Sequence, residues 1–145
     1  MSDFDIKFGP WINYGNKNTK DEIKDKMAEL INSPWSPFNG QDMAKVFIFC
    51  MSYGCAKGME PVKPPGNGSM PASAFDKEMR DYMKFVAIAH NEDFEIATNS
   101  NEVVKICEGY AYAAFLEVHD KIKNRTSSPD PSDILEKLIN EVSST

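Results

Sequence analysis

The stretch QDMAKVFIFCMSYGCAK, residues 41–57, is the most apolar part of the chain and decides its fold. It has too few polar residues for a solvent-facing side, which is typical of an element that is buried all round. Taken by themselves, residues 46–52 also fit a buried strand, because short apolar runs occur both in buried strands and in buried helices. The length of the stretch, its Met, Ala and Lys content and the opening NGQD of residues 39–42 favour a helix. We therefore expect a central buried helix over 41–57, with a strand over 46–52 as the alternative.

Helices are also predicted on both sides of this element. Thr19 and Glu22 have the spacing of a capping box, which predicts a first helix that the proline at Pro34 ends. A further helix is expected to begin near Ser73, which would cap it toward Asp76, and to stop near His90 and Asn91. Its expected apolar face consists of Phe75, Met79, Tyr82, Met83, Val86 and Ala89.

The second half of the chain carries the longest helical pattern. Apolar residues recur at intervals of three and four over 101–123, and Ser100 stands before them as the expected N-cap. Residues 125–129 are polar and read as a linker. Asp130 followed by Pro131 then predicts a short C-terminal helix. The apolar residues of this helix are Ile134, Leu135, Leu138, Ile139 and Val142.

Together these elements predict a mainly α fold, in which residues 1–145 form a single compact domain of about five helices. Residues 1–18 mix aromatic residues with Gly, Pro and Asn, and are expected to be an irregular arm or a short strand, which leaves room for one short strand pair. Residues 58–72 contain four prolines and three glycines, so they are the clearest loop of the chain.

The composition is that of a folded protein, because 41% of the 145 residues are hydrophobic and 26% are charged. The N-terminal sequence MSDFDIKFGP lacks the basic and apolar runs of a secretory signal, and the longest apolar stretch is far below the roughly 20 residues of a membrane-spanning helix. Cys50, Cys55 and Cys107 are odd in number and lie among apolar residues, which indicates buried free thiols. We expect a soluble, cytoplasmic protein.

The sequence shows no pattern for a catalytic centre, a cofactor or a metal site. On a helix, Cys50 and Cys55 point about 140° apart, which separates the two thiols. Cys107 and His119 are twelve residues apart, or about 18 Å along a continuous helix, so His119 cannot act as a base on that thiol. We expect core thiols, a surface histidine at His119, and no enzymatic activity.

Charge separates two classes of partner. The formal charge of −6 lies wholly in residues 73–145, whereas residues 1–72 hold eight acidic and eight basic residues. Because nucleic-acid binding depends on clustered Lys and Arg, we expect protein partners. The alternative is a nucleic-acid-binding module that uses the neutral half, with lysines converging beside stacking aromatics. Self-association is left open. The candidate contact residues are Trp11, Tyr14, Lys57 and Lys63, which Lys17, Lys20 and Lys45 would join in the nucleic-acid alternative.

Short core and turn motifs are spread over residues 47–116, roughly half of the chain. They are Tyr53-Gly54, Lys57-Gly58, the Pro and Gly loop, Ser73-Ala74-Phe75, Phe85-Val86-Ala87-Ile88-Ala89, Asp93-Phe94-Glu95-Ile96 and Glu108-Gly109-Tyr110-Ala111. This series resembles the small accessory proteins of Dnd-type DNA phosphorothioation defence islands. The resemblance implies a non-enzymatic partner of a prokaryotic DNA-modification or restriction complex. It assigns no site residues, and the N-terminal arm and the C-terminal helix have no counterpart in it.

Overall fold

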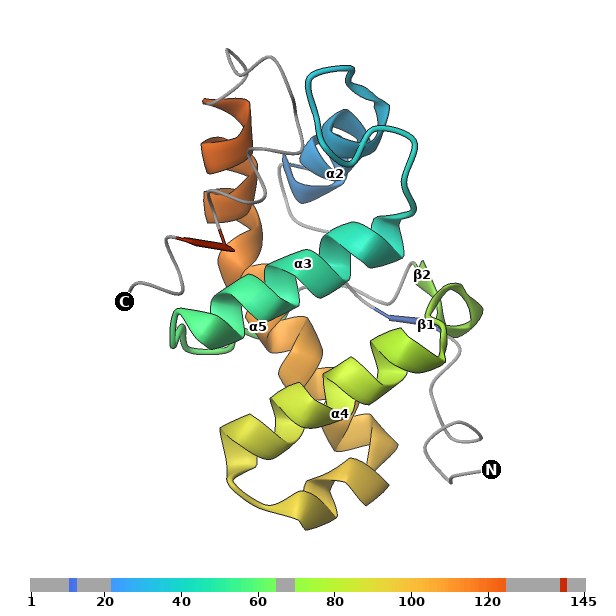
Figure 1. Cartoon of the computed structure of the whole chain (residues 1–145), viewed down its shortest axis with the longest axis vertical. Helices are drawn as coiled ribbons and strands as arrows, with labels where there is room; N and C mark the ends of the chain where they lie inside the picture. Colours follow the sequence, from blue (N-terminus) through green and yellow to red (C-terminus); the bar gives the residue numbers. More distant parts are fainter. Residues whose placement is uncertain (1–10, 13–21, 65–69, 125–138, 141–145) are drawn as a thin grey trace.

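Four α-helices make up most of the part of the chain that the computed structural model describes, residues 11–12, 22–64, 70–124 and 139–140 (Figure 1). The mainly α fold is therefore confirmed, and the helices pack in one compact domain. The expected cap at Thr19 and the start of the C-terminal helix at Asp130 lie outside the described residues. The helices are α2 (Glu22–Asn32), α3 (Met43–Ala56), α4 (Lys77–Asn91) and α5 (Ser100–Lys123).

The apolar stretch of residues 41–57 forms α3, so the prediction of a helix is confirmed. Because α3 has few polar residues, it can be covered on several sides, and it packs against α2, α4 and α5. Gly58 follows the helix with a φ of 71°, a conformation that suits glycine at a helix end. The buried residues of α3 are Ala44, Val46, Phe47, Cys50, Met51, Tyr53 and Gly54.

Helix α5 has 24 residues and runs along the long axis of the molecule, where α3 crosses it closely (Figure 1). A Cβ atom on Gly54 would lie 2.8 Å from the carbonyl oxygen of Tyr110 and 3.3 Å from the Cβ of Ala114. The missing side chain therefore lets the two helices approach each other. On another part of α5, the amide of Val62 donates a 3.0 Å hydrogen bond to the carbonyl of Gly109, which holds the loop after α3 across α5.

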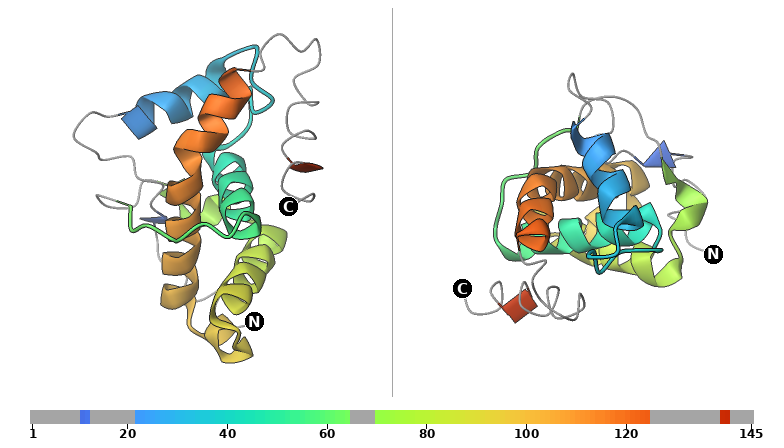
Figure 2. Two further views of the ribbon diagram at one scale, coloured as in Figure 1. Left: turned by 90° about the vertical axis from the view of Figure 1, so that its left-hand side faces the viewer. Right: turned by 90° about the horizontal axis from the view of Figure 1, so that it is seen from above.

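The other helices are arranged around this crossing. Figure 2 shows α3 and α4 on the same side of α5, with α2 near the C-terminal end of α5. The 3₁₀ helix η2 (Phe94–Thr98) connects α4 to α5 and packs against both. This arrangement leaves one face of the molecule made mainly by α3 and α4, and that face carries the candidate site.

Two predicted helix starts are wrong, and the reason is the same for both. A 3₁₀ helix, η1 (Ala72–Ala74), occupies the predicted start at Ser73, and α4 begins after Asp76, whose carboxylate accepts a 2.9 Å hydrogen bond from the Met79 amide. Asn99, and not Ser100, caps α5, since its side-chain oxygen accepts a 3.2 Å bond from the Glu102 amide. In each case the true cap is the residue whose side chain reaches an amide in the first turn.

The predicted apolar face of α4 is partly wrong. Met83 and Val86 are buried as expected, but Tyr82 and Ala89 are exposed. Because consecutive helical residues are about 100° apart, the buried stripe that contains Met83 leaves Tyr82 at the side of the helix.

The N-terminal arm meets the end of the Pro and Gly loop in a two-residue antiparallel pairing. Strand β1 (Trp11–Ile12) pairs with β2 (Met70–Pro71), with Trp11 opposite Pro71. Met70 is buried in the core, so the loop is anchored where this pairing occurs.

Candidate functional site

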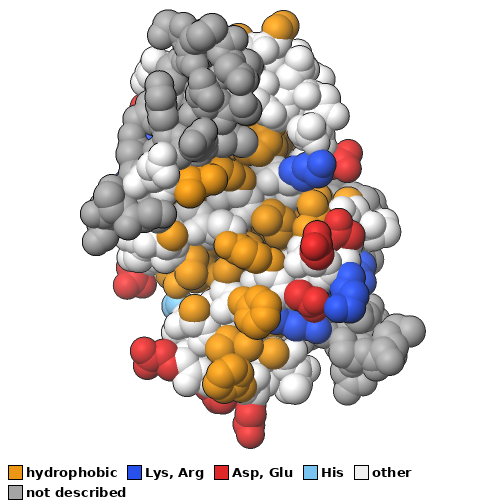
Figure 3. Space-filling model, viewed as in Figure 1, with side chains coloured by type: hydrophobic (Ala, Val, Ile, Leu, Met, Phe, Trp, Pro, Cys, Tyr) orange, Lys and Arg blue, Asp and Glu red, His pale blue; other side chains and the backbone are white. Residues whose placement is uncertain are grey.

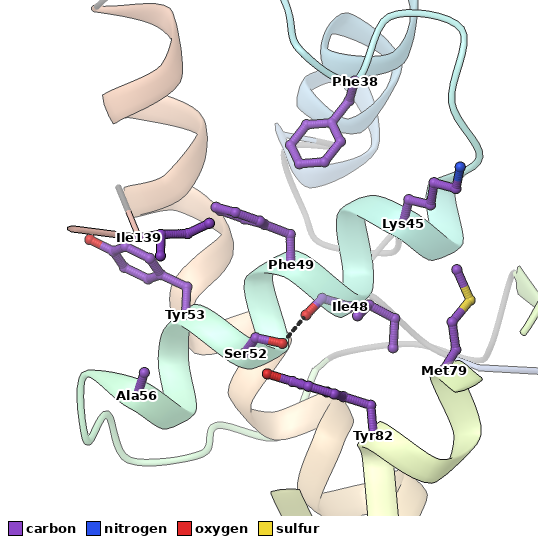
Figure 4. Close-up of a pocket in the computed structure, with 10 residues that line it drawn as sticks. All are labelled: Phe38, Lys45, Ile48, Phe49, Ser52, Tyr53, Ala56, Met79, Tyr82 and Ile139. Carbon is purple, nitrogen blue, oxygen red and sulfur yellow. Dashed lines mark hydrogen bonds between the residues drawn. The ribbon is translucent and has the colours of Figure 1, made fainter. Parts of the chain in front are cut away.

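An apolar groove of about 490 Å³ runs over α3 on the face that α3 and α4 share (Figure 4). The loop between α2 and α3 supplies one end of the groove, and the first half of α4 supplies its side. The lining residues are Phe38, Lys45, Ile48, Phe49, Ser52, Tyr53, Ala56, Met79, Tyr82 and Ile139.

Three aromatic rings form one wall of this groove. The ring of Phe38 meets that of Phe49 edge to face, with centroids 5.6 Å apart, and the ring of Phe49 stacks on that of Tyr53 at 6.5 Å. Phe49 and Tyr53 are four residues apart and therefore lie on one side of α3. Paired rings hold their positions well, so this wall is a preformed apolar surface.

Two polar side chains that line the groove are hydrogen-bonded within the molecule. The hydroxyl of Ser52 donates a 2.7 Å hydrogen bond to the carbonyl of Ile48, and the ammonium group of Lys45 donates a 2.8 Å bond to Gln41. The groove therefore presents mainly carbon atoms to an occupant. Such a surface favours aliphatic or aromatic side chains over a charged metabolite.

One lining residue comes from the C-terminal part of the chain. Ile139 lines the groove at the end where Phe49 and Tyr53 lie (Figure 4), and 54% of its surface is exposed.

The apolar surface continues beyond the groove along α4. Tyr82 lines the groove, and Phe85 follows it by three residues, so the two side chains share one side of the helix. Their exposed fractions are 48% for Tyr82 and 67% for Phe85, and that of Phe94 in the adjoining η2 is 81%. Figure 3 shows hydrophobic side chains gathered across α3 and α4 on this face. We call the groove together with Tyr82, Phe85 and Phe94 the apolar face.

Acidic residues surround the far end of the apolar face. Glu92, Asp93 and Glu95 are all exposed and are neighbours of Phe94 in the sequence. Asp93 also has a structural role, because its carboxylate accepts a 3.0 Å hydrogen bond from the Glu95 amide at the start of η2.

Lys57, a candidate contact residue, is engaged within the molecule at the outer edge of Tyr53. Its ammonium group lies 3.0 Å from the carboxylate of Glu117, which also accepts a 2.7 Å bond from the Tyr53 hydroxyl. The bond to Glu117 raises the pKa of Lys57. Although partial burial opposes ionisation of Glu117, its bonds from Tyr53 and Lys57 outweigh that cost and lower its pKa.

The remaining candidate contacts do not form one described patch. Lys63 is exposed in the loop after α3. Lys45 lies twelve residues before Lys57, and hence about 18 Å from it along α3. Trp11 is described only through the backbone pairing of β1, and Tyr14, Lys17 and Lys20 lie outside the described residues.

The cysteines are free, and two of the three are core residues as predicted. Cys50 and Cys107 are fully buried, and this burial raises the pKa of both thiols. Cys107 also points its sulfur at the carbonyl of Met83, 3.4 Å away. Cys55 is only partly buried, and burial raises its pKa as well. Such thiols form little thiolate at neutral pH and make poor nucleophiles.

The prediction that His119 is a surface residue is wrong. Its side chain is 4% exposed and stacks on Phe115, and its Nε2 lies 2.6 Å from a carboxylate oxygen of Glu29 on α2. The crossing of α2 over α5 buries the ring, which the sequence could not show. The other histidine, His90, is exposed, and its Nδ1 lies 2.8 Å from the hydroxyl of Tyr110.

Within the described ranges, no three His, Cys, Asp or Glu side chains come together as a metal site would require. None of the described helices is long and apolar enough to cross a membrane. Comparisons of the chain with models of known protein families, with curated proteins and with solved structures give no match.

The sequence reasoning missed the apolar face. Tyr53 is buried and Phe49 is partly buried against the core, as their place in the most apolar stretch predicts, so neither residue pointed to a surface site. Tyr82 was assigned to the buried side of its helix and is exposed. A signal was present at Phe85 and Phe94, two large aromatics outside the expected core positions. Their exposure becomes visible only when the packing of α4 is known.

Proposed function

We propose that this protein is a non-catalytic interaction subunit that binds another protein through its apolar face. The observation that carries the proposal is the exposure of three aromatic side chains: Tyr82 lines the groove, Phe85 lies on the same side of α4, and Phe94 belongs to the adjoining η2. Large contiguous apolar patches on soluble proteins usually mark interaction sites. Aromatic residues are also the side chains that most often dominate binding energy at protein interfaces.

Charge favours one kind of partner. The exposed acidic residues Glu92, Asp93 and Glu95 adjoin Phe94, so a complementary surface carries Lys or Arg around an apolar pocket. The same charges repel nucleic-acid phosphates at this end of the molecule. The engagement of Lys57 with Glu117 likewise supports a protein partner over the nucleic-acid alternative.

The sequence resemblance supplies the context for this proposal. A small interaction subunit fits an accessory role in a prokaryotic DNA-modification or defence complex in the cytoplasm. This part of the proposal rests on the motifs between residues 47 and 116. It is tested by the identity of the bound protein.

The test is affinity capture from the native host with matched variants of the full chain. Phe85→Ser and Phe94→Ser should lose a partner that the wild-type chain retains. Val62→Ser is the control, because Val62 is also a large exposed hydrophobic residue but lies in the loop that crosses α5. Equal retention by all four proteins would contradict the assigned face. A component of a DNA-modification or restriction complex among the retained proteins would support the accessory role.

A shift assay with DNA and RNA over a salt series separates the two partner classes. We expect no shift even at low salt. Binding that weakens steeply with salt and disappears in the chain with Lys57→Ala and Lys63→Ala would overturn the proposal in favour of nucleic-acid binding.

A further inference from the structure

The groove over α3 has chemistry suited to the side chains of an amphipathic segment. Its walls are the rings of Phe38, Phe49 and Tyr53 on one side and Met79 and Tyr82 on the other. The apolar stripe of a helix binds to such a groove through side chains spaced at three and four residues.

The chain itself contains one side chain that already lines this groove. Ile139 is separated by sequence from every other lining residue, since the others belong to residues 38–82. Ile139 thus lies in the same groove as Phe49 and Tyr53 of α3 (Figure 4).

The sequence around Ile139 has the pattern that the groove requires. Ile134, Leu138 and Val142 follow one another at intervals of four, and Leu135 stands four residues before Ile139. Side chains with this spacing lie on one side of a helix. Because the segment belongs to the same chain, its effective concentration at the groove is on the order of millimolar, which favours it over a free peptide of equal affinity.

We propose that the groove is the docking site of the chain's own C-terminal segment, residues 134–142, with Ile139 as its anchor. The segment competes there with the partner protein, while Phe85 and Phe94 stay accessible. The docking of the segment does not depend on the proposed function. Only the competition with a partner protein rests on the proposed function.

The docking is tested first in the full wild-type chain by nuclear magnetic resonance with labelled isoleucine methyl groups. We expect nuclear Overhauser contacts from the δ1 methyl of Ile139 to the ring protons of Phe49 and Tyr53. A methyl signal at the random-coil position without these contacts would overturn the proposal.

A peptide titration provides the second test. The probe is a synthetic peptide of residues 131–145, and binding is followed at the methyl signal of Ile48, which lines the groove. The full chain with Ile139→Asp should bind this peptide about ten-fold or more tightly than the wild-type chain, because the tethered competitor no longer fits. Val62→Asp is the control and should bind it as the wild type does.

A groove-side variant keeps the test independent of the C-terminal residues. Ala56 is exposed at the end of α3 and lines the groove, so Ala56→Arg places a long charged side chain there without disturbing the core. The chain with Ala56→Arg and Ile139→Asp should bind the peptide more weakly than the chain with Ile139→Asp alone. Equal peptide affinity for the wild-type chain and the Ile139→Asp chain would overturn the docking.

These measurements contain no partner protein, so they separate the docking from the proposed function. If the proposed function fails, the methyl contacts and the peptide competition are still expected. If the docking fails while Phe85→Ser and Phe94→Ser still lose a partner, the proposed function stands and only the intramolecular occupant is rejected.

Discussion

At the scale of single residues, the fold depends on Gly54 at the crossing of α3 and α5. The nearest obstacle to a side chain there is a backbone carbonyl, that of Tyr110, 2.8 Å from the position of a Cβ. A carbonyl within a helix cannot turn away as the end of a flexible side chain can. The two helices would therefore have to separate to admit even a methyl group.

Gly54→Ala should destabilise the protein by about 1–3 kcal/mol, because overpacking outweighs the gain in helix propensity of up to about 1 kcal/mol. The measurement is urea unfolding, in which the midpoint should fall at an unchanged slope. Ala89→Gly on the exposed side of α4 is the control, and it should cost only the propensity difference of about 1 kcal/mol. A Gly54→Ala variant as stable as the wild type would contradict the close crossing.

The contact between Glu29 and His119 makes a second prediction at this scale. The hydrogen bond from His119 lowers the pKa of Glu29 below its ordinary value of 4.5, with a smaller effect from Lys123 at 3.2 Å. The ionised carboxylate therefore stabilises the fold above the ordinary pKa, and this stabilisation is lost as the pH falls through the lower folded-state pKa.

Glu29→Gln should remove this pH dependence. Between about pH 5 and about pH 3, the wild-type chain should lose more stability than the Glu29→Gln chain, as measured by urea midpoints at each pH. Lys105→Gln, which affects only an exposed pair with Glu102, should follow the wild-type profile. Parallel profiles of the wild-type and Glu29→Gln chains would contradict the assigned contact.

At the scale of elements, helix ends depend on which side chain reaches an amide of the first turn. Asp76 caps α4 by its bond to Met79, whereas Ser73, the cap expected from the sequence, lies in the preceding 3₁₀ helix. Both residues are good caps by type. The backbone of Asp76 is extended, with φ −76° and ψ 178°, which aims its carboxylate at the helix.

Asp76→Ala should destabilise the protein by about 1 kcal/mol, the usual cost of a lost N-cap. Ser73→Ala should change stability by less than about 0.5 kcal/mol, because Ser73 is exposed outside the helix. Thermal or urea unfolding of both variants checks the pair. A larger loss for Ser73→Ala than for Asp76→Ala would move the start of α4 back to the predicted position.

At the scale of the whole molecule, the apolar face carries large aromatic side chains that contribute little to the stability of the fold. Phe85 and Phe94 are mostly exposed, so they contribute little to the core that surrounds α3. A protein under selection for stability and solubility alone has no need for two such residues on its surface.

Phe85→Ser and Phe94→Ser together should leave the free energy of unfolding within about 0.5 kcal/mol per site of the wild-type value. The same variant should bind less of a hydrophobic dye such as anilinonaphthalene sulfonate. Phe47→Ser is the contrast, because Phe47 is fully buried against Phe75 and its loss should cost several kcal/mol, about 3 or more. A large loss of stability in the first variant would show that these rings are structural.

The sequence by itself determined the mainly α fold, the central place of α3 and the core position of Cys50 and Cys107. These features follow from apolar patterns along one element, and such patterns are local. It also predicted the end of α4 near His90, since the apolar stripe stops there.

Only the tertiary structure decided where the surface lies. Ser73 and Ser100 were expected to be caps, but cap choice depends on backbone angles that the residue type does not fix. His119 was expected at the surface and is buried because α2 crosses α5. The two residues in contact there, Glu29 and His119, are 90 residues apart in the sequence. The groove is lined by Phe49, Tyr82 and Ile139, which come from three separate parts of the chain. Burial is a property of packed elements, so the sequence could place these residues on helices but could not say which helix faces remained uncovered.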